Sequence, residues 1–191
     1  MLRIFGGAAL AATLVFFWGF LFWTVLPVGS GAVQGAPDGA ALQAALDAEL
    51  PASGSYMVPY SEQPDSDTAY HEAHTAGPIA LIYFRKNGAE PMAPGVLLRG
   101  WLHGFATLLL MAVLVRLLAG NGGFGLRFGI AAGGGIVGSV FAHLGAPIWW
   151  YQPWDFALTQ LSYEAGAWVL GGLVLAALLR SGPPKPSLTQ L

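Results

Sequence analysis

The sequence predicts a mostly α-helical membrane protein with four transmembrane helices and a small α+β insertion between the first and second helices. Of its 191 residues, 55% are hydrophobic and only 9% are charged, whereas about a quarter of the residues in soluble domains are charged. The hydrophobic residues gather in runs that reach the roughly 20 residues needed to span a bilayer. After the first run, the composition changes to Ala, Pro, Ser and acidic residues, which is typical of a segment outside the membrane.

The first hydrophobic run covers residues 4–28, follows Arg3 and contains no charged residue. A signal peptide has a shorter apolar region, of about 7 to 15 residues, followed by a cleavage site with small residues. This run instead contains Trp18 and Trp23 and ends near Pro27. We therefore expect an uncleaved transmembrane helix in residues 1–28.

Residues 29–95 form the predicted insertion, which we expect to lie in the periplasm. Asp38 can cap a helix over residues 40–50. The residues at 55–59 and 79–86 favour two strands, because the second is rich in β-branched and aromatic residues. Asn87-Gly88 then follows as a tight-turn signal.

The segment between the two predicted strands, residues 61–78, shows no apolar periodicity. This pattern predicts a surface loop with one helical turn near residues 70–74.

The remaining runs predict three further transmembrane helices at residues 97–119, 128–148 and 154–179, so residues 96–180 complete a four-helix bundle. Gly134 and Gly138 belong to small-xxx-small patterns in the third helix, which allow another helix to approach closely. Residues 181–191 are a proline-rich tail, which we expect on the cytoplasmic side.

The distribution of basic residues predicts the orientation in the membrane, because cytoplasmic ends of helices retain Lys and Arg. With four helices, most of the basic residues near helix ends fall on one side: Arg3, Arg116, Arg127, Arg180 and Lys185. We expect a multi-pass protein of a bacterial inner membrane with both termini in the cytoplasm.

Several classes of function lack support in the sequence. The net charge of −2 provides no basic surface for nucleic acid. The absence of cysteine excludes disulfides, thiolate metal sites and a cysteine nucleophile. The sequence also has no phosphate-binding glycine loop and no nucleophile elbow. An enzyme is therefore not motivated by any motif, although composition leaves the question open.

Four polar residues in the predicted helices form the first candidate site: His103, Gln160, His143 and Glu164. An ionisable residue inside a membrane is by default a functional hypothesis. We expect all four to lie in the outer half of the bilayer. They could join helices by hydrogen bonds, bind a b-type haem or metal through the two imidazoles, or hold a quinone, lipid or small solute.

His71 and His74 form a second candidate site, for zinc or copper. Imidazoles three residues apart can share a helical face, with Glu62, Asp65 or Asp67 as a third ligand. The string is one residue short of the zincin motif, whose histidines are four apart. The alternative is an ordinary solvated loop.

Trp149, Trp150 and Trp154 form an aromatic cluster that suits a belt at the membrane surface or a contact with another membrane protein. Together with Gly134 and Gly138 they make up the predicted interface. We therefore expect an accessory or assembly subunit of a larger inner-membrane complex, respiratory or photosynthetic, with membrane lipid and other integral membrane subunits as partners. The alternative is a membrane protein that binds haem b, a metal or a quinone at the His/Glu site.

Overall fold

Four long apolar helices dominate the fold of residues 2–179, the part of the chain that the computed structural model describes. The helical segments Leu2–Val25, Pro94–Ala119, Phe124–Trp149 and Trp154–Leu178 are each long and apolar enough to cross a membrane. The prediction of a mostly helical chain with four candidate spans and a small sheet is confirmed. The predicted tail at residues 181–191, with Arg180 and Lys185, lies outside the described residues.

The first span consists of α1 (Leu2–Phe20) and a π-helical turn, η1 (Leu21–Val25). Leu26 leaves the helical conformation at φ −78° and ψ 137°, because it precedes proline and the α region is disfavoured there. Pro27 then starts the short helix α2 (Pro27–Ser30). The first span therefore ends a few residues before the boundary at residue 28 that the sequence predicts.

The insertion contains α3 (Gly39–Glu49), β1 (Gly54–Val58), α4 (Thr68–Ala76) and β2 (Ala80–Phe84). The two strands pair in an antiparallel sheet, with Gly54 opposite Phe84 and Val58 opposite Ala80. The predicted cap of α3 is confirmed, since the Asp38 carboxylate accepts a hydrogen bond from the Ala41 N–H over 2.9 Å.

One element of the insertion differs from the sequence prediction. Residues 68–76 form the helix α4, where the lack of apolar periodicity predicted a loop with one helical turn. The Asp67 carboxylate caps this helix by accepting from the Tyr70 N–H, and it also accepts from the Ser61 hydroxyl. These two hydrogen bonds hold the pKa of Asp67 below its usual value of 3.8, and the bond from the Tyr70 N–H lowers it more than the bond from Ser61. Local capping, rather than an apolar stripe, therefore defines this helix.

Lys86 joins α3 to the end of the sheet. Its ammonium group lies 2.8 Å from the Asp47 carboxylate and donates to the Asp47 and Leu50 carbonyls at 2.6 and 3.3 Å. These carbonyls belong to the last turn of α3, where a cation satisfies otherwise unpaired acceptors. The insertion is thus connected by polar contacts and has no fully buried residue in either of its helices.

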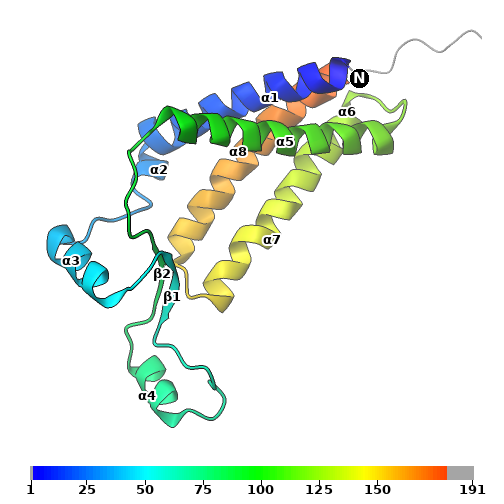
Figure 1. The fold of residues 1–191 in the computed structure, drawn as a ribbon. Helices are drawn as coiled ribbons and strands as arrows, with labels where there is room; N and C mark the ends of the chain where they lie inside the picture. The colour runs from blue at the N-terminus through cyan, green and yellow to red at the C-terminus, as the bar shows by residue number, and fades with distance from the viewer. Residues whose placement is uncertain (1, 180–191) are drawn as a thin grey trace, which may run out of the picture.

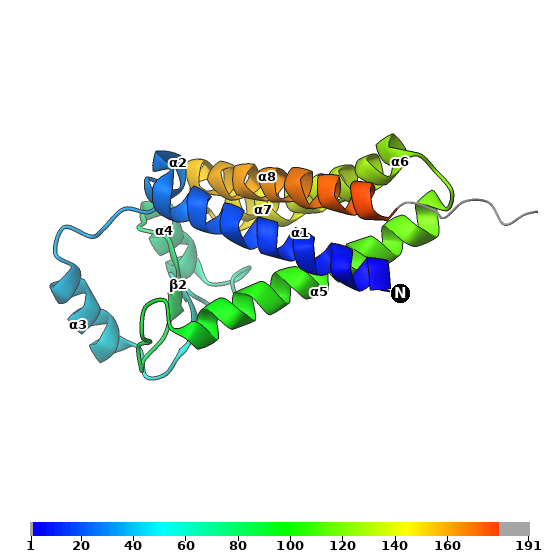
Figure 2. The same cartoon turned by 90° about the horizontal axis from the view of Figure 1, so that it is seen from above.

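The other three spans are α5 (Pro94–Ala119), a composite of α6 (Phe124–Phe128), η2 (Gly129–Gly133) and α7 (Gly134–Trp149), and α8 (Trp154–Leu178). Helix α1 packs along α5 and α8, while α7 packs along α8. Figure 1 shows that α5 and α7 approach each other near α6 and diverge toward the insertion. The view from above in Figure 2 shows the same separation of α5 from the α7–α8 pair.

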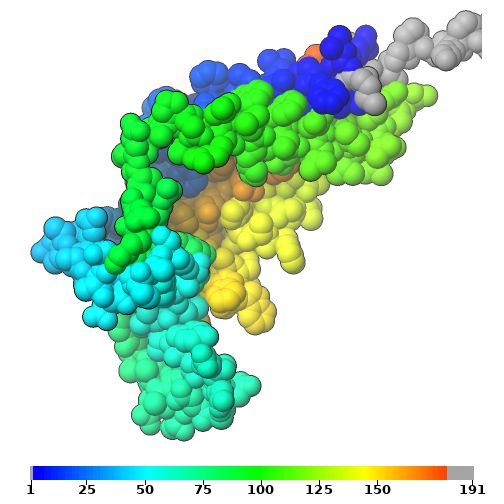
Figure 3. Space-filling model, viewed as in Figure 1, coloured from blue at the N-terminus to red at the C-terminus, as the bar shows by residue number. Residues whose placement is uncertain are grey.

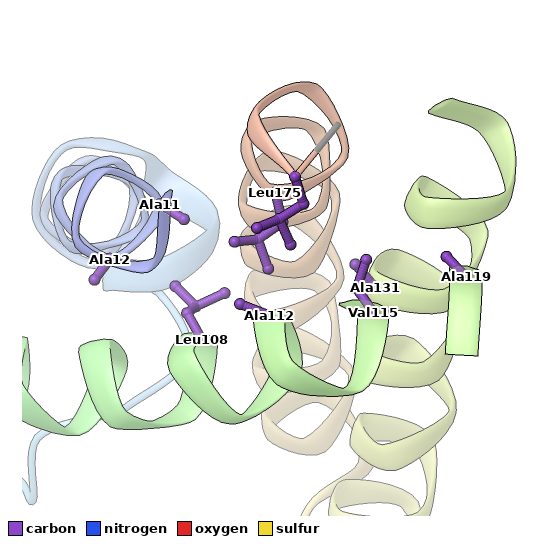
Figure 4. Close-up of a cluster of buried hydrophobic side chains, with 9 residues drawn as sticks. Ala11, Ala12, Leu108, Ala112, Val115, Ala119, Ala131 and Leu175 are labelled. Carbon is purple, nitrogen blue, oxygen red and sulfur yellow. The ribbon is translucent and has the colours of Figure 1, made fainter. Parts of the chain in front are cut away.

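The buried core lies where α1, α5, α8 and η2 meet (Figure 4). Most of its members are small, so the helix axes can approach closely. The cluster consists of Ala11, Ala12, Leu108, Ala112, Val115, Ala119, Ala131, Leu175 and Leu179. The core therefore draws on all four spans toward the α6 end and leaves the divergent ends of α5 and α7 without a shared core.

Candidate functional site

A group of polar side chains joins α7 to α8 near the middle of the spans. The Ser139 hydroxyl lies 2.6 Å from Glu164 Oε2 and 3.0 Å from the Gly135 carbonyl. A hydroxyl has one proton, and the shorter, charge-assisted bond is the one it donates to the carboxylate. The Trp168 indole N–H donates back to the Ser139 oxygen over 3.1 Å. Ser139 therefore connects Trp168 to Glu164.

His143 occupies the other oxygen of the same carboxylate. Its Nε2 atom lies 2.8 Å from Glu164 Oε1. The approach is not aligned as a hydrogen bond, so the contact is an ion pair when the imidazole is protonated. The side chains of His143 and Glu164 are 18% and 34% exposed. The structure thus brings together His143 and Glu164, two of the four residues that the sequence selected.

Glu164 lies deep in its span. It is near the middle of the 25 residues of α8, about 15 Å along the axis from the Trp154 end at 1.5 Å per residue. The hydrocarbon core of a bilayer is about 30 Å thick. A carboxylate at that depth is costly unless protein groups or a proton neutralise it.

The exposed part of Glu164 faces the space between α5 and α7. Glu164, Trp168 and Gly171 follow one another at i, i+4 and i+7, which places them on one face of α8. Trp168 lies against Gly135 of α7, and a Cβ at Gly171 would be 2.9 Å from Leu108 of α5. This face of α8 therefore looks toward both helices. In Figure 3 the surface is hollowed between α5 and α7, with α8 at the base; we call this region the hollow.

The other two candidate residues take different positions. Gln160 lies one turn before Glu164 on α8, and its side-chain oxygen accepts from the Gln152 amide over 2.9 Å. His103 is exposed on α5, which packs against α1. Within residues 2–179 no contact connects His103 to His143 or Glu164. His143 is already engaged by Glu164, and haem ligation by the two imidazoles stays a prediction.

The glycines of the third span divide into packed and open positions. Gly135 is covered by the Trp168 ring, whereas a Cβ at Gly138 would meet nothing within 4 Å and one at Gly134 would meet only Met111 at 3.9 Å. The close approach of α8 therefore occurs at Gly135. Gly134 and Gly138, which the sequence selected for an interface, lie on the open side of α7, and their role in binding another helix stays a prediction.

The aromatic residues at the ends of α7 and α8 remain exposed. Trp149, Trp150 and Trp154 are each more than half exposed, which suits the belt or contact surface predicted for them. Trp150 also lines a pocket of about 680 Å³ against the sheet of the insertion. The other lining residues are uncharged: Ser55, Tyr56, Met57, Tyr60, Leu81 and Tyr83.

The two histidines of the candidate metal site, His71 and His74, both lie on α4. The His74 ring packs edge-on against Tyr151, with 5.3 Å between ring centroids, and also contacts Tyr70. No group of three or more metal-ligating side chains occurs in the part of the chain that the structure describes. His74 therefore links the insertion to the loop between α7 and α8, and we propose no metal at His71 and His74.

Three residues that make polar contacts in the structure are not among the candidates from the sequence: Ser139, Trp168 and Arg127. Ser139 lies one turn before His143 on α7 and Trp168 one turn after Glu164 on α8, so a search at i±4 around the ionisable residues would have found both. Arg127 is buried; its Nε donates to the Ala176 carbonyl over 3.0 Å, and its guanidinium also donates to Gly122. In the sequence, Arg127 serves only as an indicator of orientation.

The four helices are compatible with a multi-pass membrane protein, whose polar site joins α7 and α8. Comparisons of the chain with protein-family models, with curated proteins and with solved structures each give no match.

Proposed function

We propose that the chain is a non-catalytic accessory or assembly subunit of a larger membrane complex. The observation that carries this proposal is the open side of the helix bundle. Helix α7 packs against α8 and η2. On the opposite side of α7, Val137 is 70% exposed and Phe141 is 89% exposed. In a four-helix bundle the core positions of all four helices face one another. Here α5 and α7 diverge instead, which supports a bundle completed by another protein.

Two further features support docking at the same end of the molecule. Trp149, Trp150 and Trp154 are exposed at the adjoining ends of α7 and α8, and Trp150 lines the pocket against the sheet of the insertion. Aromatic residues are enriched in the buried cores of protein interfaces. We place the protein in a bacterial inner membrane, with the insertion in the periplasm and both termini in the cytoplasm, because most basic helix ends lie opposite the insertion.

The test is affinity purification of the tagged full-length protein from its native membranes in a mild detergent, followed by mass spectrometry. The proposal expects a fixed set of integral membrane proteins in constant stoichiometry through a second, size-exclusion step. A matched purification with an unrelated tagged four-span protein identifies background. Recovery of the chain alone, or only with copies of itself, would contradict the accessory role.

A second candidate function is supported by the ion pair in the hollow. The Glu164 carboxylate, the His143 imidazole and the nearby Gln160 could hydrogen-bond the head group of a quinone or another small polar ligand that enters from the membrane. Extraction of the purified protein and chromatography of the extract would detect such a ligand. This function requires that His143→Ala abolish its recovery while His103→Ala does not. An empty extract from the wild-type protein would contradict it.

A further inference from the structure

We propose that the hollow between α5 and α7 receives one transmembrane helix of a different subunit, and that this helix carries a lysine or arginine at the depth of Glu164. The inference rests on the proposed accessory function and specifies the partner's binding site.

The wall formed by α7 can accept a helix at short distance. Gly134, Gly138, Phe141 and Gly145 recur at i, i+4, i+7 and i+11, so they lie on one face. A Cβ at Gly138 would meet nothing within 4 Å, and those at Gly134 and Gly145 would meet only side-chain atoms at 3.9 Å. Close backbone approach at small residues is the usual mode of helix association in membranes.

The wall formed by α5 also carries small residues. A Cβ at Gly104 would meet nothing within 4 Å, and one at Gly100 would meet only the Phe16 ring at 3.9 Å. Both glycines lie in the half of α5 that diverges from α7 (Figure 1). Small residues on both walls leave room for the side chains of an incoming helix.

Glu164, at the base of the hollow, determines which side chain the incoming helix needs. An ionised carboxylate can accept about four hydrogen bonds, and the described residues place only Ser139 and His143 against Glu164. About one third of its side chain is exposed, and Glu164 lies on the face of α8 that looks toward α5 and α7. Lipid tails fill space there but donate no hydrogen bond. A basic side chain supplies both the missing donors and the compensating charge.

Residues 2–179 of a second copy of this chain offer no suitable cation. Between residues 2 and 179 every Lys and Arg in a span is close to a helix end, while Glu164 is near the middle of α8. These residues are Arg3 in the first turn of α1, Arg99 in the first two turns of α5, Arg116 in its last turn, and Arg127 in α6. The complementary charge must therefore come from a different protein.

The experiment places the photoreactive amino acid p-benzoylphenylalanine at Phe141, on the rim of the hollow, and at Phe17 as the matched control. Phe17 is 64% exposed, and it lies with Leu10 and Leu14 on the side of α1 that faces away from α5 and α8. Both variants are expressed in native membranes, illuminated, purified and analysed by mass spectrometry. We expect an adduct from Phe141, absent from Phe17, with a protein that co-purifies stoichiometrically with the wild type.

The cross-linked peptide decides the proposal. It must belong to a transmembrane segment of that partner and contain a Lys or Arg near its middle. An adduct with a second copy of this chain, with lipid only, or with a segment that lacks a basic residue would overturn the inference. If the partner co-purifies but Phe141 gives no adduct, the docking site is wrong while the accessory function stands. If no partner co-purifies, the accessory function itself has failed.

Two substitutions test the shape and the charge separately. Gly138→Leu fills the hollow and should reduce the yield of co-purified partner at least fivefold, whereas Gly6→Leu, at another open glycine in a span, should not. Glu164→Gln keeps the shape of the side chain and should reduce the yield by a similar factor. Each variant is compared with the wild type by size-exclusion chromatography, so that a misfolded variant is recognised. Unchanged yield from a folded Gly138→Leu variant would also overturn the inference.

Discussion

Gly135 on α7 lies directly against the indole ring of Trp168 on α8, so close that a Cβ at this glycine would overlap the ring. The same indole donates its N–H to Ser139 one turn further along α7. The packing of α7 on α8 and the position of the polar site therefore depend on the same tryptophan.

The contact between Gly135 and Trp168 predicts a position-specific effect of adding one methyl group. Gly135→Ala should lower the free energy of unfolding by about 1 to 3 kcal/mol, because the ring is packed on α8 and cannot move freely. Thermal unfolding in detergent micelles measures the change. Gly138→Ala is the matched control, since its Cβ enters open space. Equal stability of the two variants would contradict this packing.

Removal of the Ser139 hydroxyl should weaken the α7–α8 contact. Ser139→Ala removes the donor to Glu164 and the acceptor of the Trp168 N–H, so we expect a loss of about 1 kcal/mol, the scale measured for polar contacts between membrane helices. Unfolding monitored by circular dichroism provides the measurement. Ser162→Ala is the control, because Ser162 is exposed and bonds only the Leu158 carbonyl of its own helix. A larger loss in the control would argue against the role given to Ser139.

Arg127 should stabilise the end of α8. The Ala176 carbonyl lies in the last turn of this helix, where carbonyls lack partners within the helix, and Arg127 donates to it. Arg127→Met should cost about 1 to 3 kcal/mol by leaving that buried acceptor unpaired. Arg116→Met should change stability by less than about 0.5 kcal/mol, because Arg116 is exposed. Chemical unfolding of both variants in mixed micelles tests the difference, and similar losses would contradict it.

The cap of α4 should respond to acid. Because hydrogen bonds from Tyr70 and Ser61 lower the pKa of Asp67 in the folded protein, the ionised carboxylate stabilises the helix. That contribution is complete above the unfolded pKa, near 3.8, and is lost as the pH falls through the lower folded pKa. The chemical shift of the Tyr70 amide proton, followed against pH by NMR, should give a midpoint below 3.8. Asp67→Asn should remove this transition, and a midpoint above 3.8 in the wild type would contradict the cap.

The sequence predicted the four spans because long apolar runs carry a strong, local signal. The cap of α3 at Asp38 was also predicted from the sequence, because its side chain accepts a hydrogen bond from the backbone only three residues later, within one turn. Helix α4 was predicted only as one helical turn near residues 70–74, because its residues show no apolar period. Its cap at Asp67 was present in the sequence, but a single capping residue is a weaker signal than periodicity.

The candidate site was predictable only in part. Ionisable residues within apolar runs identified Glu164 and His143, since such residues are rare in membranes. The sequence could not exclude His103 from the same site, because depth along a helix is set by spacing whereas direction around it depends on packing. In the structure α5 packs along α1 and diverges from α7, which leaves His103 exposed and apart from the ion pair.

The sequence by itself determined what each segment can do: composition and run length define four apolar helices, and local caps and turns define the insertion between the first two. The tertiary structure decided which residues meet. Gly135 rather than Gly134 or Gly138 receives the neighbouring helix, and Glu164 pairs with His143 rather than with His103. The physical reason is that contacts between helices depend on the rotation of each helix about its axis and on the crossing angles. Both result from packing over the whole bundle, so the sequence of a single helix does not determine them.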